Sequence, residues 1–191
     1  MKEGHFQTID WYMCRSTQGD KNMNFRPAVI QDLPQIKQIY CDIIQHMNEN
    51  QTPIWDDIYP CKFFEGDIMN NRLYLMLDNA EILSAFALCE SHSGESAVEW
   101  EGCSGKALYL DRLGVNPNYC RKGIGSLMLA KAKETARTLG AKYLRLFVVD
   151  TNTPAIQLYS KNGFTRVKGI YDERVDSDYI LHQYGYEIQL Y

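Results

Sequence analysis

The chain has 191 residues, of which 45% are hydrophobic and 23% charged, and its formal net charge at pH 7 is −4. These values are typical of a soluble globular protein with one domain. A negative protein exerts no long-range attraction on a polyanion, which argues against nucleic acid as a partner. The cysteines and histidines show no spacing typical of zinc ligands, so the sequence predicts no metal site.

The first 22 residues are polar, show no periodicity and contain no apolar core of the kind that a signal peptide needs. We therefore predict an N-terminal extension over residues 1–22 and a single domain over residues 23–191. Asp78 and Glu81 interrupt the most apolar stretch, which argues against a membrane span. We expect a cytoplasmic protein with reduced cysteines and no membrane partner.

In chain order, the first half is predicted to contain a short strand, an amphipathic helix, a loop, a short second helix and a hairpin, at residues 25–28, 33–50, 51–60, 61–71 and 72–91. Asp32 is the expected N-cap of the long helix, and Asp78-Asn79 is the expected turn of the hairpin. The loop is rich in aromatic and acidic side chains.

The second half follows a connection rich in Gly, Ser and Glu. Its patterns predict a strand, a helix, a strand, a helix and two final strands, at residues 106–115, 123–139, 142–150, 153–163, 164–171 and 184–191. Thr153 is the expected N-cap of the second of these helices. Because strands and helices alternate only here, we expect a mixed sheet whose parallel part surrounds the two βα units.

Alternation along the strand at 106–115 predicts which side chains share a face of the sheet. One face is expected to carry Leu108, Leu110 and Arg112, and the other Tyr109, Asp111 and Leu113.

A loop of glycines and basic residues, NYCRKGIGS at 118–126, precedes the helix at 123–139. The free N–H groups at the start of a helix suit an anion such as phosphate. Gly123 and Gly125 would let the backbone approach it closely, and Arg121 and Lys122 add positive charge. The sequence lacks the P-loop motif and the third Rossmann glycine, which argues against both nucleotide folds. The alternative is a glycine-softened helix start with solvated basic residues.

Two segments between residues 108 and 164 resemble the GNAT superfamily of acetyl-CoA-dependent N-acetyltransferases. The first is a hydrophobic strand ending in Leu-Gly-Val-Asn-Pro, followed by the glycine loop. The second fits N-x-x-A-x-x-L-Y-x-x-x-G-F from Asn152 to Phe164. In element order, the resemblance extends from Met23 to the end of the chain.

The resemblance implies an α/β (α+β) protein with the GNAT fold: a mixed twisted central sheet of about seven strands, flanked by helices and splayed at the middle strand. It also implies acetyl-CoA as a co-substrate. The glycine loop would hold the pyrophosphate of coenzyme A, and the strand edge would pair with its pantetheine arm. The implied cofactor-binding residues are Leu113, Gly114, Val115, Cys120, Arg121, Lys122, Gly123, Ile124, Gly125, Ser126, Asn152, Ala155 and Tyr159.

Acetyl transfer to an amine requires a free amine nitrogen, a site for the developing oxyanion and a proton for the leaving thiolate. By resemblance, Tyr159 is the candidate acid and the Val115 N–H the oxyanion donor. Asp111 is the candidate base, with Glu101 and Glu99 as rivals. The alternative for Tyr159 is a packed helix aromatic, and for Asp111 a carboxylate paired with an arginine.

Aromatic and acidic residues in two stretches suit a cationic acceptor. The candidate substrate-binding residues are Trp55 and Tyr59, beside Asp56 and Asp57, and Trp100 and Tyr109, beside Glu101. Packing over the core is the alternative for Trp55 and Tyr59. We expect an N-acetyltransferase for a primary amine on a small molecule or a protein, with a non-catalytic acyl-CoA sensor or scaffold as the alternative. ATP phosphotransfer has little support. A homodimer is compatible with the resemblance.

Cys120 stands where the superfamily usually has Arg or Gln, so the side-chain donor of that position is missing. We expect weaker coenzyme A binding rather than none. The neighbouring basic residues and the helix start also predict a lowered pKa for the Cys120 thiol.

Overall fold

The computed structural model describes residues 23–102, 104–175 and 179–191. The predicted N-terminal extension lies outside these residues. The helices, including short 3-10 helices (η), are η1 (Ile30–Asp32), α1 (Leu33–Glu49), η2 (Cys61–Phe63), α2 (Phe64–Met69), η3 (Pro117–Tyr119), α3 (Ile124–Thr138) and α4 (Thr153–Lys161). The strands are β1 (Met23–Pro27), β2 (Leu73–Asp78), β3 (Glu81–Cys89), β4 (Val98–Glu99), β5 (Ala107–Val115), β6 (Tyr143–Val149), β7 (Thr165–Arg166), β8 (Lys168–Gly169), β9 (Tyr171–Arg174) and β10 (Ile180–Gln189).

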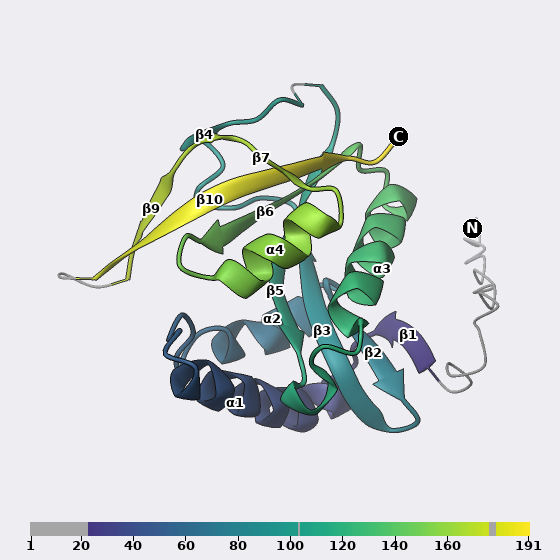
Figure 1. Ribbon diagram of the computed structural model, residues 1–191. Coiled ribbons are helices and arrows are strands. Elements are labelled where there is room, and N and C mark those ends of the chain that lie inside the picture. The colour runs from purple at the N-terminus through teal and green to yellow at the C-terminus, as the bar shows by residue number, and fades with distance from the viewer. Residues whose placement is uncertain (1–22, 103, 176–178) are drawn as a thin grey trace, which may run out of the picture.

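The central sheet has the strand order β1-β2-β3-β5-β6-β10-β7, and β9 pairs with β10. This mixed sheet confirms the predicted fold class. Helices α3 and α4 pack on one face and α1 and α2 on the other, so the sheet has a hydrophobic core on each side (Figure 1). None of the helices in the described ranges is long and apolar enough to cross a membrane.

The parallel part of the sheet is narrower than the two βα units predict. Strands β5 and β6 pair in parallel as expected, but β7 pairs with β10 and not with β6. The long strand β10 takes that place because it matches β6 along its whole length, from Tyr143 to Val149, whereas β7 has only two residues. Strands β4 and β8 form a separate small sheet that the sequence pattern did not predict.

Strands β5 and β6 separate soon after they meet. Their pairing extends from Ala107 to Tyr109 on β5 and from Tyr143 to Arg145 on β6. Beyond this point the two strands diverge (Figure 1), and β5 continues against β3 alone. The segment Leu113–Val115 therefore lies past the last β6 partner, at the splay that the family resemblance implies.

A β-bulge changes which side chains of β5 share a face. Ala85 pairs with Gly114 and Ala87 with Asp111, so Phe86 lies opposite two residues, Arg112 and Leu113. Arg112 has a left-handed backbone with φ 55°. The expected alternation is wrong from this point: Leu113 packs on the core under α3, while the Arg112 side chain reaches Asp67 of α2 on the opposite face. An extra residue in a bulge shifts the alternation in this way.

The start of α1 is stabilised by an ion pair from β1. Asp32 occupies the N-cap position as predicted, but its carboxylate caps η1 instead, by accepting a hydrogen bond from the Val29 N–H. Arg26 donates to both of its oxygens, at 2.7 and 2.8 Å. The Arg26 guanidinium makes the largest contribution to lowering the pKa of Asp32, against an opposing effect of burial.

We expect Asp32→Asn to lower the free energy of unfolding by about 1 kcal/mol at pH 7, because the charge-assisted hydrogen bonds weaken. A carboxyl group whose pKa is lowered by folding stabilises the protein above its unfolded pKa, and this contribution is lost as the pH falls through the folded pKa. The difference from the wild type should therefore shrink steadily below about pH 4. Urea unfolding at several pH values measures it, and a difference that stays constant with pH would contradict this account.

Candidate active site

The glycine loop leads into the N-terminus of α3 with free backbone donors. Gly123 is the N-cap and has a left-handed backbone with φ 82°, and it offers no side chain to cap the helix. The first N–H groups of α3, from Ile124 to Ser126, therefore have no capping side chain and point out of the helix end. Arg121 and Lys122 beside them are exposed. This geometry can hold a phosphate.

Gly125 has a role in packing that the sequence analysis did not predict. A Cβ at this position would lie 3.0 Å from a methyl group of Leu158 on α4. Asn162, at the end of α4, donates a hydrogen bond to the Ser126 hydroxyl at 3.1 Å. The glycine loop and α4 are therefore in direct contact, and the position of one helix sets that of the other.

The N-cap of helix α4 lies one residue earlier than expected. Asn152, not Thr153, is the N-cap, and its side-chain oxygen accepts a hydrogen bond from the Ala155 N–H at 3.2 Å. The prediction for Thr153 was wrong because Asn152 already satisfies this donor, and Pro154 occupies the second helical position. These contacts show that Asn152 orients the start of the helix, while its implied role in cofactor binding stays a prediction.

Tyr159 lies on the face of α4 that packs on the sheet. Its ring contacts Phe164 and Tyr186, with ring centroids 6.0 and 6.5 Å away, and the residue is 9% exposed. The hydroxyl has no hydrogen-bond partner within the described ranges. Burial raises the pKa of Tyr159 well above its usual value, and the charge of Asp111 raises it further. The hydroxyl therefore stays protonated at neutral pH and can donate a proton.

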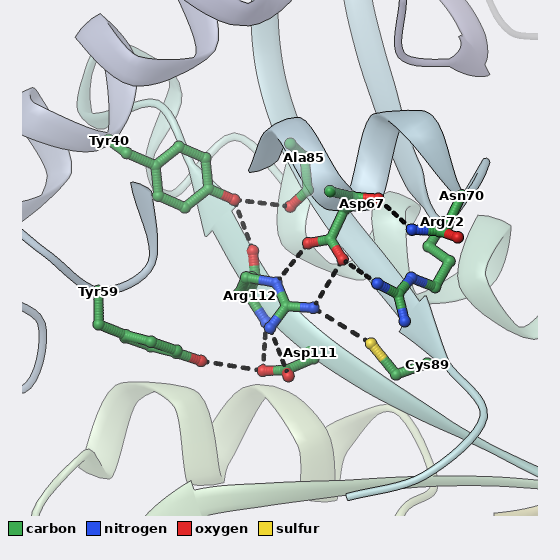
Figure 2. Close-up of polar contacts among 10 residues, drawn as sticks. Tyr40, Tyr59, Asp67, Asn70, Arg72, Ala85, Cys89, Asp111 and Arg112 are labelled. Carbon is green, nitrogen blue, oxygen red and sulfur yellow. Dashed lines mark hydrogen bonds and ion pairs between the residues drawn. The ribbon is translucent and has the colours of Figure 1, made fainter. Parts of the chain in front are cut away.

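Asp111 is held by three donors at the bulge (Figure 2). Arg112 donates to it from its guanidinium at 2.8 Å and from its backbone N–H at 2.9 Å. The Tyr59 hydroxyl donates at 3.0 Å, and Asp111 raises the pKa of Tyr59 in addition to the larger effect of burial. The side chain of Asp111 is 21% exposed. Asp111 is thus both paired with an arginine, as the alternative interpretation expected, and in contact with Tyr59 of the loop at residues 51–60.

The four candidate acceptor residues form two aromatic groups. Trp55 stacks on Tyr40 and meets Tyr59 edge-on at 6.2 Å, so this pair covers the core and also reaches Asp111. Trp100 meets Tyr109 edge-on at 6.0 Å, and this pair packs on the same core as Trp55, on the α1 and α2 side of the sheet. Tyr109 is buried, and Trp100 is partly covered.

Glu101 lies apart from the other candidates. It is exposed and lines a hollow of about 360 Å³ together with residues of β7 and β10. No other predicted site residue is among the described residues that line this hollow. The position of Glu101 therefore favours Asp111 over Glu101 as the candidate base.

Two polar residues that the sequence analysis missed lie within range of the Asp111 charge. Burial raises the pKa of Glu173 on β9, and the Asp111 charge adds to this effect. Burial lowers the pKa of His92, with an opposing effect of Asp111, and His92 stacks on Phe147 at 4.3 Å. The His92 Nδ1 accepts from the Gly94 N–H, so the neutral ring carries its proton on Nε2. Neither residue lies in a motif, and folding alone brings them to the site.

The expected lowering of the pKa of the Cys120 thiol was wrong. Partial burial raises the pKa of its thiol, and the opposing effect of Arg121 is smaller. Cys120 lies at the end of η3 and three residues before the N-cap of α3, too far to gain from the helix dipole. The described residues contain no group of three or more His, Cys, Asp or Glu that could hold a metal ion.

Comparison with known proteins gives consistent matches. Residues 37–164 match the Acetyltransferase (GNAT) family. YwnH of Bacillus subtilis, which carries the name of a phosphinothricin acetyltransferase, is 27% identical over 74% of this chain and 83% of that protein. The thialysine N-epsilon-acetyltransferase of Bos taurus is 36% identical over 44% of this chain and about half, 52%, of that protein. The crystal structure of Arabidopsis thaliana NAA60 with acetyl-CoA has a TM-score of 0.66 at 19% identity, covering 88% of this chain and 98% of that one.

Proposed function

The chain belongs to the Acetyltransferase (GNAT) family, and from this we propose that it transfers the acetyl group of acetyl-CoA to a primary amine. The amine nitrogen attacks the thioester carbonyl directly, the carbon–sulfur bond breaks, and the amine loses a proton. The observation that carries the proposal is Tyr159, a buried side chain whose protonated hydroxyl has no hydrogen-bond partner among the described residues and lies within range of the Asp111 charge. A protein that only bound acyl-CoA, without transferring the acyl group, would not need a proton donor at this position.

In this proposal, each part of the site has one task. The free N–H groups from Ile124 to Ser126 bind the coenzyme A pyrophosphate, with Arg121 and Lys122 at the rim. The edge Leu113–Val115, which β6 leaves unpaired, binds the pantetheine arm as a neighbouring strand would. The Val115 N–H stabilises the oxyanion, and Tyr159 gives its proton to the thiolate.

The acceptor in this proposal is a cationic amine, on a small molecule or on a protein. Asp111 and Glu173 lie close enough for the charge of one to raise the pKa of the other. Two carboxylates beside the aromatic ring of Tyr59 suit an ammonium group, which must lose a proton before it attacks. Two relatives are named for the acetylation of phosphinothricin and of thialysine, and both compounds carry a primary amine, so they are the first acceptors to test.

The test is the release of coenzyme A thiol from acetyl-CoA in the presence of thialysine, phosphinothricin, a diamine or a peptide with a free N-terminus. We expect at least one primary amine to accelerate release about 100-fold or more above hydrolysis. The N-trimethylated form of the same compound is the matched control, because it keeps its positive charge but cannot be acetylated. Binding of acetyl-CoA in a calorimeter without release on any amine would contradict the proposal and favour the acyl-CoA sensor.

A further inference from the structure

A buried network of charges surrounds the bulge of β5 and is not explained by either core (Figure 2). Arg112 is 7% exposed and Asp67 of α2 is 1% exposed. The Arg112 Nε lies 2.8 Å from Asp67, its Nη1 lies 2.8 Å from Asp111, and its Nη2 donates to Cys89 at 3.1 Å. One guanidinium thus connects a helix and two strands. Such a fork fits an arginine and no other side chain.

The network also fixes the backbone of the bulge. Arg112 has the left-handed conformation that an L-residue with a side chain rarely adopts. The Tyr40 hydroxyl donates a hydrogen bond to the backbone carbonyl oxygen of Arg112. Because the bulge shifts the alternation, the side chains of Arg112 and Asp111 reach the same face, where they pair with each other. Without the bulge, the two side chains would lie on opposite faces of β5.

The network extends from Arg112 to residues 51–60, which we call the acceptor loop. The Tyr59 hydroxyl of this loop donates to Asp111, the carboxylate that Arg112 holds. A second path runs through Phe63, whose ring lies 5.1 Å from the Arg112 guanidinium and meets the Tyr59 ring edge-on at 5.6 Å. Both paths begin at Arg112 and end at Tyr59.

We infer that Arg112 is a positioning residue that fixes the Asp111 carboxylate and, through it, holds the acceptor loop beside the end of β5. Asp67 fixes the guanidinium from the opposite side. The bulge immediately precedes Leu113–Val115, so the same contacts place the acceptor loop relative to the cofactor edge. The effect on acetyl transfer rests on the proposed function, whereas the effect on the loop does not.

Amide hydrogen exchange of the acceptor loop tests the inference without any substrate. Within the loop, the Asp56 N–H donates to the Tyr59 carbonyl oxygen, and the Ile58 and Tyr59 N–H groups donate to the Asp56 carboxylate, so these three amides are protected while the loop stays in place. Arg112→Lys keeps the charge but cannot span Asp67 and Asp111 together. We expect the amides of Asp56, Ile58 and Tyr59 to exchange about tenfold faster in this variant, with the amides of α3 unchanged. Equal acceleration in α3, or no acceleration in the loop, would overturn the inference.

Two further variants separate positioning from general destabilisation. Tyr59→Phe removes one hydroxyl and leaves the buried ion pairs intact, and it should accelerate loop exchange in the same way. Because both variants act through Asp111, the double variant should exchange no faster than the faster single one, whereas independent effects would multiply. Arg26→Lys alters a forked pair with Asp32 at the start of α1 and is the matched control, in which loop exchange should not change.

Kinetics then test the consequence for transfer. With the best amine found, Arg112→Lys and Tyr59→Phe should raise the KM for the amine about tenfold and leave the KM for acetyl-CoA within about twofold of the wild type. An equal rise in both KM values would overturn the role in acceptor positioning. If no amine is acetylated by the wild type, the proposed function fails, while the exchange experiment still decides whether Arg112 holds the loop.

Discussion

Replacing Tyr159 by phenylalanine is expected to lower kcat about 100-fold and to leave the KM for acetyl-CoA unchanged. The ring contacts with Phe164 and Tyr186 remain, so the substitution removes a proton donor without leaving a cavity. The loss in kcat should lie at the lower end of the range for general acid catalysis, because a thiol with a pKa of about 8.5 leaves with only modest help from an acid. Steady-state rates with a fixed amine measure this effect.

The raised pKa of Tyr159 sets the pH dependence of kcat that we expect if Tyr159 is the acid. Burial and the Asp111 charge raise the pKa of Tyr159, so the hydroxyl is protonated at neutral pH and keeps its proton at pH values above those at which an exposed tyrosine ionises. The wild-type kcat should therefore show no fall up to about pH 10 from the loss of this proton. Tyr186→Phe is the matched control, since Tyr186 is equally buried and neighbours Tyr159. Similar kcat values for Tyr159→Phe and the wild type would rule out the acid role.

Asp67→Ala is expected to cost about 3 kcal/mol of unfolding free energy, the largest effect on stability that we predict. Asp67 is almost fully buried and pairs with Arg112 at 2.8 Å and with Arg72 at 3.2 Å. Burial lowers the pKa of Arg112, but the carboxylates of Asp111 and Asp67 outweigh it and raise the pKa. Without Asp67, the buried guanidinium stays charged and loses one of its two carboxylate partners.

Urea unfolding of Asp67→Ala and of Asp32→Asn measures how the burial of an ion pair changes its contribution to the free energy of unfolding. Both carboxylates pair with an arginine, but the Arg26 partner of Asp32 is 33% exposed while the Arg112 partner of Asp67 is 6% exposed. Removing a partner from the buried pair should therefore cost at least about twice as much as weakening the exposed pair. Equal costs for the two variants would show that Asp67 is not needed to neutralise Arg112.

Much of the fold could be predicted because its signals are local. The apolar spacing of α1 and α3, the hairpin turn at Asp78-Asn79 and the end of α4 at Gly163 each depend on a few neighbouring residues. The place of β10 between β6 and β7 could not be predicted, since pairing depends on which strand matches β6 along its length. The small sheet of β4 and β8 has strands of two residues, too short for any periodicity.

The candidate site likewise has residues that the sequence could predict and residues that only the fold brings together. The glycine loop and Tyr159 stand in motifs, and the structure brings the loop into contact with α4, the helix that carries Tyr159. The partners of Asp111 depend on the bulge, which no alternation pattern predicts, because one extra residue moves Arg112 to the other face. Glu173 and His92 come from distant segments, and only the folded chain brings them near Asp111.

The short pairing of β5 with β6 has a consequence for cooperativity. Among the described residues, three residues on each strand form the only pairing inside the central sheet between strands β1, β2, β3 and β5 and strands β6, β10 and β7, while β4 and β8 pair separately. A ligand that extended this pairing along Leu113–Val115 would add backbone hydrogen bonds between the two parts. Coenzyme A bound in this way should raise the melting temperature and merge any separate unfolding of the two parts into one transition. In this protein the cofactor would then complete the sheet as well as take part in the reaction.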